Sequence, residues 1–181
     1  TPFPRIPYRE AMLKYGTDKP DLRIDIECAE VGDIFEGSDF KVFAGAVAKG
    51  QVVRAIPAPG AVGRPRSFFD GMIAFAQSQG APGLGYIQFQ AGEAKGPVAK
   101  FLDEGRLAAI KERCGLGDGD AVFFACDKAA KAAALAGEAR KRLGEELELI
   151  DDGAFKFCWI VDFPMYEWDE EAKAVAFSHN P

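Results

Sequence analysis

The run AVFFAC at residues 121–126 is the most strongly apolar stretch of the chain and the one that decides its fold. Its aromatic and branched side chains, bounded by polar residues, predict a buried strand. Asp127 follows, and it is expected to cap a helix over residues 128–143, where alanine and leucine recur at helical spacing. We therefore expect Val122, Phe123 and Phe124 to belong to the core and not to a functional site.

Further helices and strands are predicted on either side of this pair. Apolar spacing and end signals predict helices over residues 7–15, from Ser67 as N-cap to Gly80, and over 103–114 before Gly115. Strands are predicted over residues 22–27 and 85–90, and hairpins over 41–48 with 51–56 and over 155–163 with 172–178, the second joined by the acidic segment 167–171. This irregular alternation favours an α+β fold with an antiparallel sheet over a wound parallel sheet.

Composition indicates an ordinary globular protein. The 181 residues are 48% hydrophobic and 28% charged, a balance that excludes disorder as the main state and allows one or two domains. Lys and Arg number 22 against 28 Asp and Glu, so the net charge is -6. That charge argues against a protein that neutralises a polyanion over its whole surface, although a local basic patch remains compatible with it.

Cysteines and apolar runs indicate an intracellular protein. The four cysteines are far apart and only one histidine accompanies them, so no zinc-ligand set is expected, and buried reduced thiols are favoured over disulfides. No apolar run approaches the roughly 20 residues that span a bilayer, and the first residues lack a secretory signal. We expect a cytoplasmic protein that binds neither membranes nor DNA.

No general catalytic motif identifies an enzyme, so single residues carry the functional hypotheses. His179 is the only histidine and hence the only possible imidazole base or ligand, although a polar residue at a strand end is the simpler interpretation. Asp162 either is catalytic or bonds the backbone in the turn before Pro164, and the turn is favoured.

Two groups of basic residues are candidate phosphate contacts. Arg64 and Arg66 flank a loop rich in proline and glycine, and Lys128 and Lys131 begin the basic helix. Forked arginine donors on a loop suit phosphate, and a basic helix face suits an RNA backbone. For the arginine loop, charges that only meet water are an equally good interpretation, and for the basic helix they are the favoured one.

Several ordered strings resemble one family. FPRIPYREAM at 3–12, YGTDKPDLR at 15–23, WIVDFPMYE at 159–167 and SHNP at 178–181 resemble the catalytic domain of bacterial-type aspartyl-tRNA synthetase. Between them, VFAG at 42–45, GLGYI at 83–87, KGPVAKFL at 95–102 and GDAVFF at 119–124 resemble the GAD domain, which is inserted into that catalytic domain in this family. The resemblance covers the whole chain.

The resemblance implies a fold and a division of the chain. It implies a GAD-like insertion domain over residues 31–148, with an antiparallel sheet and helices, between catalytic-domain segments over 1–30 and 149–181 that pair as a small lobe. The chain stops directly after a predicted strand, so we expect a piece of a longer protein. The family's class-defining motifs are then expected outside the chain.

The resemblance also implies an activity. The family is a class II ligase that activates L-aspartate with ATP and Mg²⁺ and transfers it to tRNA, and its members form homodimers. The isolated chain is expected to be inactive and to bind no cofactor. His179 matches the family's aspartate-contacting histidine, and a charge-assisted hydrogen bond from imidazole to a carboxylate is physically reasonable. Asn180 departs from the second histidine common in the family.

Two alternatives remain open. The whole chain could be an RNA-docking domain of a tRNA-dependent amidotransferase subunit, which carries a related GAD domain, although the synthetase-like terminal strings speak against it. Within the synthetase hypothesis, the inserted domain either contacts tRNA through Arg64, Arg66, Lys128 and Lys131 or serves as a scaffold for the catalytic domain.

Overall fold

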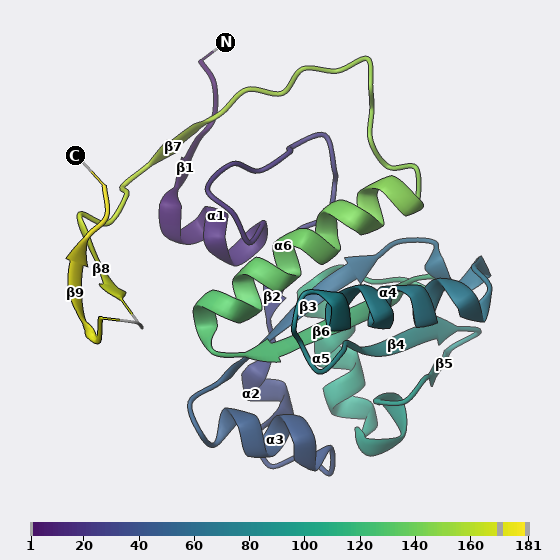
Figure 1. Ribbon diagram of the computed structural model, residues 1–181. Helices are drawn as coiled ribbons and strands as arrows, with labels where there is room; N and C mark the ends of the chain where they lie inside the picture. Colours follow the sequence, from purple (N-terminus) through teal and green to yellow (C-terminus); the bar gives the residue numbers. More distant parts are fainter. Residues whose placement is uncertain (1, 170–171, 180–181) are drawn as a thin grey trace.

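A five-stranded antiparallel sheet forms the centre of the molecule. The computed structural model describes residues 2–169 and 172–179. The strands are β2 (Ala29–Glu30), β3 (Val52–Ala58), β4 (Gly85–Gln90), β5 (Glu93–Lys95) and β6 (Ala121–Asp127), in the order β2-β3-β6-β4-β5. All neighbours pair antiparallel, with β6 in the middle (Figure 1). The predicted α+β class is confirmed.

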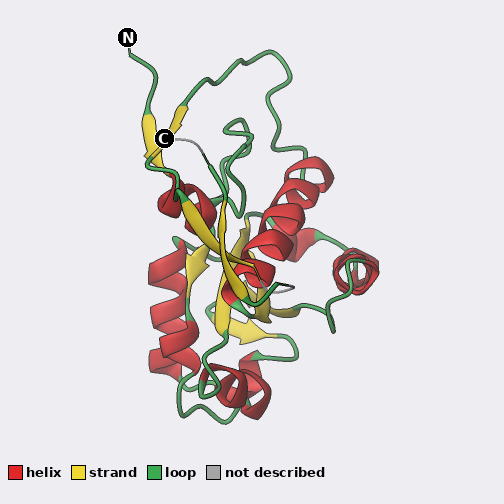
Figure 2. Ribbon diagram, turned by 60° about the vertical axis from the view of Figure 1, so that its left-hand side comes forward, coloured by secondary structure: helices red, strands yellow, loops and turns green. Residues whose placement is uncertain are grey.

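Helices cover both faces of this sheet (Figure 2). One core lies beneath α4 (Arg66–Ser78) and α6 (Ala129–Glu146), and the other beneath α2 (Gly32–Phe35), α3 (Lys41–Val47) and α5 (Glu104–Cys114). Short 3₁₀ turns lie at Ala61–Gly63 and Ala99–Phe101. Phe123 of β6 packs into the first core and Phe124 into the second. The apolar run is uninterrupted because both faces of this central strand are buried.

Three predicted elements match closely, and two predicted caps are wrong, because the N-cap of α6 is Lys128 and not Asp127. The strand at 121–126, the strand at 85–90 and the helix at 103–114 are β6, β4 and α5, and the Asp103 carboxylate accepts a hydrogen bond from the backbone N–H of Arg106. α4 buries the expected apolar face. Its N-cap is Pro65, however, and Ser67 lies inside the first turn without a capping hydrogen bond. Pro65 sets an extended backbone there, which starts the helix two residues earlier.

The first predicted hairpin is wrong, because residues 41–47 form α3 and not a strand. Phe43 decides the outcome, since its ring packs against Phe35 and Phe124 with centroid separations of 5.0 and 6.2 Å. The spacer that suggested a hairpin turn instead ends the helix. Gly50 adopts a positive φ of 80°, and its N–H donates to the carbonyl of Val47.

The predicted strand over residues 22–27 is also wrong in its pairing. Ile24 and Ile26 are buried, as the alternation predicted, but residues 22–24 form a turn and a bend, and residues 25–27 have no partner strand. The carbonyl groups of Ile24 and Ile26 instead accept hydrogen bonds from the guanidinium of Arg140 on α6. A buried arginine thus takes the place of a neighbouring strand.

The two terminal segments meet outside the central sheet. β1 (Arg5–Pro7) precedes α1 (Tyr8–Lys14) and pairs in parallel with β7 (Trp159–Val161) (Figure 1). β8 (Tyr166–Asp169) and β9 (Ala174–Phe177) form an antiparallel hairpin. The predicted second hairpin therefore has the wrong partner, because residues 159–161 pair with β1 and the acidic segment already begins within β8.

The four cysteines are free, and burial decides their chemistry. Desolvation raises the pKa of Cys28 to about 12 and the pKa values of Cys114 and Cys126 to about 11. These thiols are therefore protonated and poorly nucleophilic at neutral pH. Over residues 2–169 and 172–179, no helix has the length and apolar character needed to cross a bilayer.

Candidate functional site

His179 lies where the two terminal segments meet. Its ring packs against Phe163 and Tyr8, with centroid separations of 4.8 and 5.9 Å, and the Tyr8 and Phe163 rings are 5.1 Å apart. Tyr8 begins α1, whereas Phe163 follows β7 and His179 follows β9. Pairing of β1 with β7 brings these distant parts of the chain together. Asn180 and Pro181, the rest of the predicted motif, lie outside the described residues.

A carboxylate organises the polar side of this cluster. Glu167 on β8 accepts hydrogen bonds from the Ser178 hydroxyl, at 2.6 Å, and from the Tyr8 hydroxyl, at 3.0 Å. The Nδ1 atom of His179 lies 2.9 Å from Ser178 Oγ and 3.3 Å from the carbonyl oxygen of Pro164. The chain of contacts runs from Tyr8 through Glu167 and Ser178 to His179. Sequence analysis found His179 but missed Tyr8 and Glu167, which no local pattern marks.

The ionisation of Tyr8 and Glu167 reflects these contacts. Burial, and then the hydrogen bond and negative charge of Glu167, raise the pKa of Tyr8 to about 12. The hydrogen bond from Ser178 lowers the pKa of Glu167, and the Tyr8 hydrogen bond and the nearby His179 act in the same direction. At neutral pH the phenol is therefore protonated and the carboxylate ionised, as donation from Tyr8 to Glu167 requires.

Arg64 and Arg66 lie beside the start of α4. The Arg64 guanidinium stacks over the Phe68 ring at 5.6 Å and donates to the backbone carbonyl of Glu146, at the C-terminal end of α6. Arg66 forms an exposed ion pair with Asp70 at 3.5 Å, and its side chain is 89% exposed. Arg64 therefore helps to cap a helix, whereas Arg66 is open to an outside partner.

Lys128 and Lys131 lie at the other end of α6. Both side chains are exposed, and Lys128 is the N-cap position of the helix. α6 has 18 residues, so the two basic groups are separated by about 27 Å along its axis. The four candidate phosphate contacts thus form two separate groups and not one patch.

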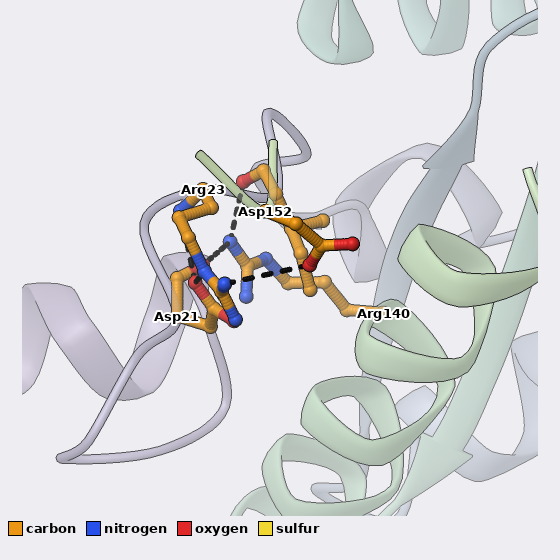
Figure 3. A network of polar contacts seen from close by, with 5 residues as sticks. Asp21, Arg23, Arg140 and Asp152 are labelled. Atoms are coloured by element: carbon orange, nitrogen blue, oxygen red, sulfur yellow. Dashed lines mark hydrogen bonds and ion pairs between the residues drawn. The ribbon is translucent and has the colours of Figure 1, made fainter. Parts of the chain in front are cut away.

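A buried arginine joins the N-terminal segment to α6 (Figure 3). Arg140 is 2% exposed, and its guanidinium donates to the carbonyls of Asp21, Ile24 and Ile26 at 3.0, 2.7 and 2.6 Å. It also lies over the Tyr15 ring at 4.8 Å. We call these contacts the Arg140 clasp. Burial lowers the pKa of Arg140, and three carbonyl acceptors compensate the desolvated charge.

Small residues on α6 allow the same segment to approach closely. A Cβ atom on Gly137 would lie 2.9 Å from the carbonyl oxygen of Tyr15, and one on Gly144 would lie 2.8 Å from Ile24. Gly137, Arg140 and Gly144 share one face of α6, three and four residues apart. Sequence analysis missed this face, although an arginine between two glycines at helical spacing was the available signal.

A wide groove beside α5 does not suit RNA. A groove of about 890 Å³ runs between the segment at residues 25–30 and the end of α5. Six acidic residues line it, namely Asp25, Glu27, Glu30, Asp33, Glu112 and Asp120. Its two cations already form ion pairs, Lys14 with Glu27 and Arg113 with Asp33. A polyanion would be repelled there.

Comparison with known proteins gives the class of this fold. The GAD domain family matches residues 43–136, which include the sheet from β3 to β6, α4, α5 and the first part of α6. The chain belongs to the GAD domain family.

The relatives extend the similarity to the terminal segments. The chain is 61% identical over its whole length to the aspartate--tRNA(Asp/Asn) ligase of Rickettsia felis and 60% identical to that of Rickettsia africae, and it spans 30% of the length of each. The ligase of the same name from Paramagnetospirillum magneticum is 60% identical over 99% of the chain, which spans 20% of that protein. The amidotransferase alternative is not favoured.

Proposed function

We propose that this chain is part of a cytoplasmic aspartate–tRNA ligase that activates L-aspartate with ATP and Mg²⁺ and transfers it to tRNA. One observation carries the proposal: identity of about 60% to ligases of this name extends over the whole chain, including both segments that form the His179 cluster. The names of these relatives support charging of both aspartate and asparagine tRNA. The complete ligase is proposed to be a homodimer.

The proposed domain boundaries are 1–30 and 149–181 for the catalytic-domain segments and 31–148 for the inserted domain. The family match at residues 43–136 falls inside the inserted domain. Pairing of β1 with β7 supports the assignment of both terminal segments to one unit.

His179 is the proposed contact for the substrate carboxylate. The ring is held by Phe163 and Tyr8, and its Nδ1 atom is occupied by Ser178 and Pro164. Nε2 is then the nitrogen available to a ligand, and as the imidazolium it donates a charge-assisted hydrogen bond to a carboxylate. Such a bond orients L-aspartate for attack on ATP by its other carboxylate.

The described residues provide no cluster of side chains for a metal ion such as Mg²⁺. Residues 2–169 and 172–179 bring together no three histidine, cysteine, aspartate or glutamate side chains that could hold a metal ion. In the complete ligase, ATP and Mg²⁺ are proposed to bind outside this chain, and the isolated chain is proposed to be inactive.

The test uses the complete ligase that contains this chain. His179→Gln is expected to raise the KM for L-aspartate in pyrophosphate exchange about tenfold or more, because one charge-assisted hydrogen bond is removed. Lys141→Gln, on an exposed position of α6, is the control. Charging of aspartate and asparagine tRNA transcripts is measured in parallel. Absence of aspartate-dependent exchange in the wild-type ligase would refute the activity, and charging of aspartate tRNA alone would refute the dual specificity.

Arg64, Arg66, Lys128 and Lys131 remain the proposed tRNA contacts of the inserted domain. Arg66 is supported best, because its ion pair with Asp70 is exposed and long. Arg66→Ala with Lys131→Ala is expected to weaken tRNA binding and to reduce the slope of log K against log salt by about 0.9 for each phosphate that is no longer neutralised. An unchanged slope would favour the scaffold role, which the Arg140 clasp also supports.

A further inference from the structure

The hydrogen bonds around His179 determine where its ring proton lies. The carbonyl of Pro164 can only accept, so its contact with Nδ1 requires a proton on that nitrogen. The Ser178 hydroxyl has one proton, which it donates to Glu167 at 2.6 Å. Ser178 Oγ is consequently an acceptor toward Nδ1 as well. Both neighbours of Nδ1 are acceptors, and a single arrangement of protons satisfies the cluster.

Glu167 is the residue on which this arrangement depends. As a carboxylate it is acceptor-only, so it accepts from both Tyr8 and Ser178 and directs the serine proton away from the histidine. Tyr8 comes from α1, the opposite end of the chain, and places one Glu167 oxygen. The array therefore assembles only when the two terminal segments are paired.

We propose that Glu167, held by Tyr8 and Ser178, is a positioning residue that keeps a proton on Nδ1 of His179, so that Nε2 faces the ligand and donates to its carboxylate when the ring is the imidazolium. The proposal rests on the proposed function only in taking this ligand to be L-aspartate. A ligating histidine commonly has its outer nitrogen fixed by a hydrogen-bonded neighbour, and the same arrangement orients catalytic imidazoles. Here a serine relays the effect of the carboxylate to the ring.

The direct test is the tautomer of His179 in the chain of 181 residues. His179 is its only histidine, so ¹⁵N-histidine labelling gives one pair of ring signals. Long-range ¹H–¹⁵N correlation, at a pH where titration shows the ring to be neutral, reports which nitrogen carries the proton. The proposal predicts Nδ1–H, whereas an unrestrained imidazole favours Nε2–H. An Nε2–H signal in the wild-type chain would overturn the proposal without reference to any variant.

Glu167→Gln tests the relay itself. The glutamine amide can donate to Ser178, which frees the serine hydroxyl to donate to Nδ1 and moves the ring proton to Nε2. We expect the tautomer to reverse in Glu167→Gln and to shift less in Tyr8→Phe. Tyr166→Phe, an exposed neighbour whose ring contacts Phe177, is the matched control and should change nothing. Retention of Nδ1–H in Glu167→Gln would overturn the relay.

A kinetic measurement separates this proposal from the proposed function. In the complete ligase, Glu167→Gln is expected to raise the KM for L-aspartate about tenfold with a smaller change in kcat, because a serine hydroxyl that donates to Nδ1 opposes the imidazolium that binds the carboxylate; Glu167→Asp is expected to recover part of the loss. If the tautomer reverses while the KM stays unchanged, the array exists but L-aspartate is not the ligand. If His179→Gln raises the KM while wild-type His179 is the Nε2–H tautomer, His179 contacts L-aspartate but Glu167 does not fix its ring proton.

Discussion

The two terminal segments are attached to the molecule in contrasting ways. The N-terminal segment packs onto α6, where Arg140 binds three of its carbonyls and Gly137 meets Tyr15. The C-terminal segment contacts the rest through β1 and the His179 cluster, and through the exposed ion pair of Asp152 with Arg23 and the ring pair of Phe157 with Phe3. It exposes large apolar side chains, namely Phe155, Phe157, Trp159, Met165, Tyr166, Trp168, Val175 and Phe177.

This difference shows which contacts are complete within the chain. Clustered exposed apolar side chains mark an interface, and the relatives are three to five times longer than this chain. The exposed segment therefore fits the proposal that the remainder of a ligase covers it. The N-terminal segment, in contrast, is held against α6 by contacts that lie entirely within this chain.

The largest effect on stability is expected when an aromatic side chain is removed from the central sheet, and the comparison is with an aromatic side chain removed from the exposed C-terminal segment. Phe123→Ala deletes a fully buried ring and should lower the free energy of unfolding by about 3–5 kcal/mol. Trp168→Ala removes a larger but exposed ring and should change it by less than about 0.5 kcal/mol. Urea unfolding of both variants measures the comparison. Similar losses in the two variants would show that the C-terminal segment is part of the core.

The Arg140 clasp is expected to contribute the next largest effect. Arg140→Ala leaves three carbonyls without their donor and should cost about 3 kcal/mol in urea unfolding. Lys141→Ala is the control, because the Lys141 side chain is exposed and its removal should change the free energy of unfolding by less than about 0.5 kcal/mol. Equal effects of the two substitutions would contradict the clasp.

The contrast between the segments also explains what the sequence could predict. β6 and α5 were predictable because short-range periodicity and end signals determine a buried strand and a capped helix. Residues 22–27 were not, since the partner of their carbonyls is a guanidinium more than a hundred residues away. α3 was misjudged because its type depends on where Phe43 packs. In the site, the single histidine was predictable from composition, whereas its neighbour Tyr8 lies at the other end of the chain.

A moderate effect is expected where the N-terminal segment approaches α6. Gly16 has a φ of 69°, and a Cβ there would collide with the carbonyl oxygen of Ala133. Gly16→Ala should therefore lower the free energy of unfolding by about 2 kcal/mol. Gly71→Ala, within α4 and with no neighbour near its Cβ position, should instead stabilise the chain by up to about 1 kcal/mol. Thermal unfolding of both variants measures the difference. An unchanged stability of Gly16→Ala would show that the N-terminal segment does not pack closely against α6.

The smallest effect is expected from pH at the His179 cluster. Hydrogen bonds lower the pKa of Glu167 in the folded chain. Its contribution to the stability of the His179 cluster is therefore fully present above about pH 4.3, the ordinary pKa of a glutamate. The contribution disappears as the pH falls through the lower folded pKa, because protonation removes an acceptor. The nuclear Overhauser effect between the Tyr8 and Phe163 rings should weaken over that range in the wild type but not in Glu167→Gln. A pH-independent signal in the wild type would show that Glu167 does not hold the cluster.

Hydrogen exchange of the chain tests the contrast between the two terminal segments most directly. The account predicts slow exchange in β6, substantial protection of the amide of Cys28, which donates to the carbonyl of Lys14 at 2.8 Å, and fast exchange in β8 and β9. Protection of β8 and β9 equal to that of β6 would contradict the open C-terminal segment. Exchange of the Cys28 amide as fast as that of β8 would contradict the attachment of the N-terminal segment to α6.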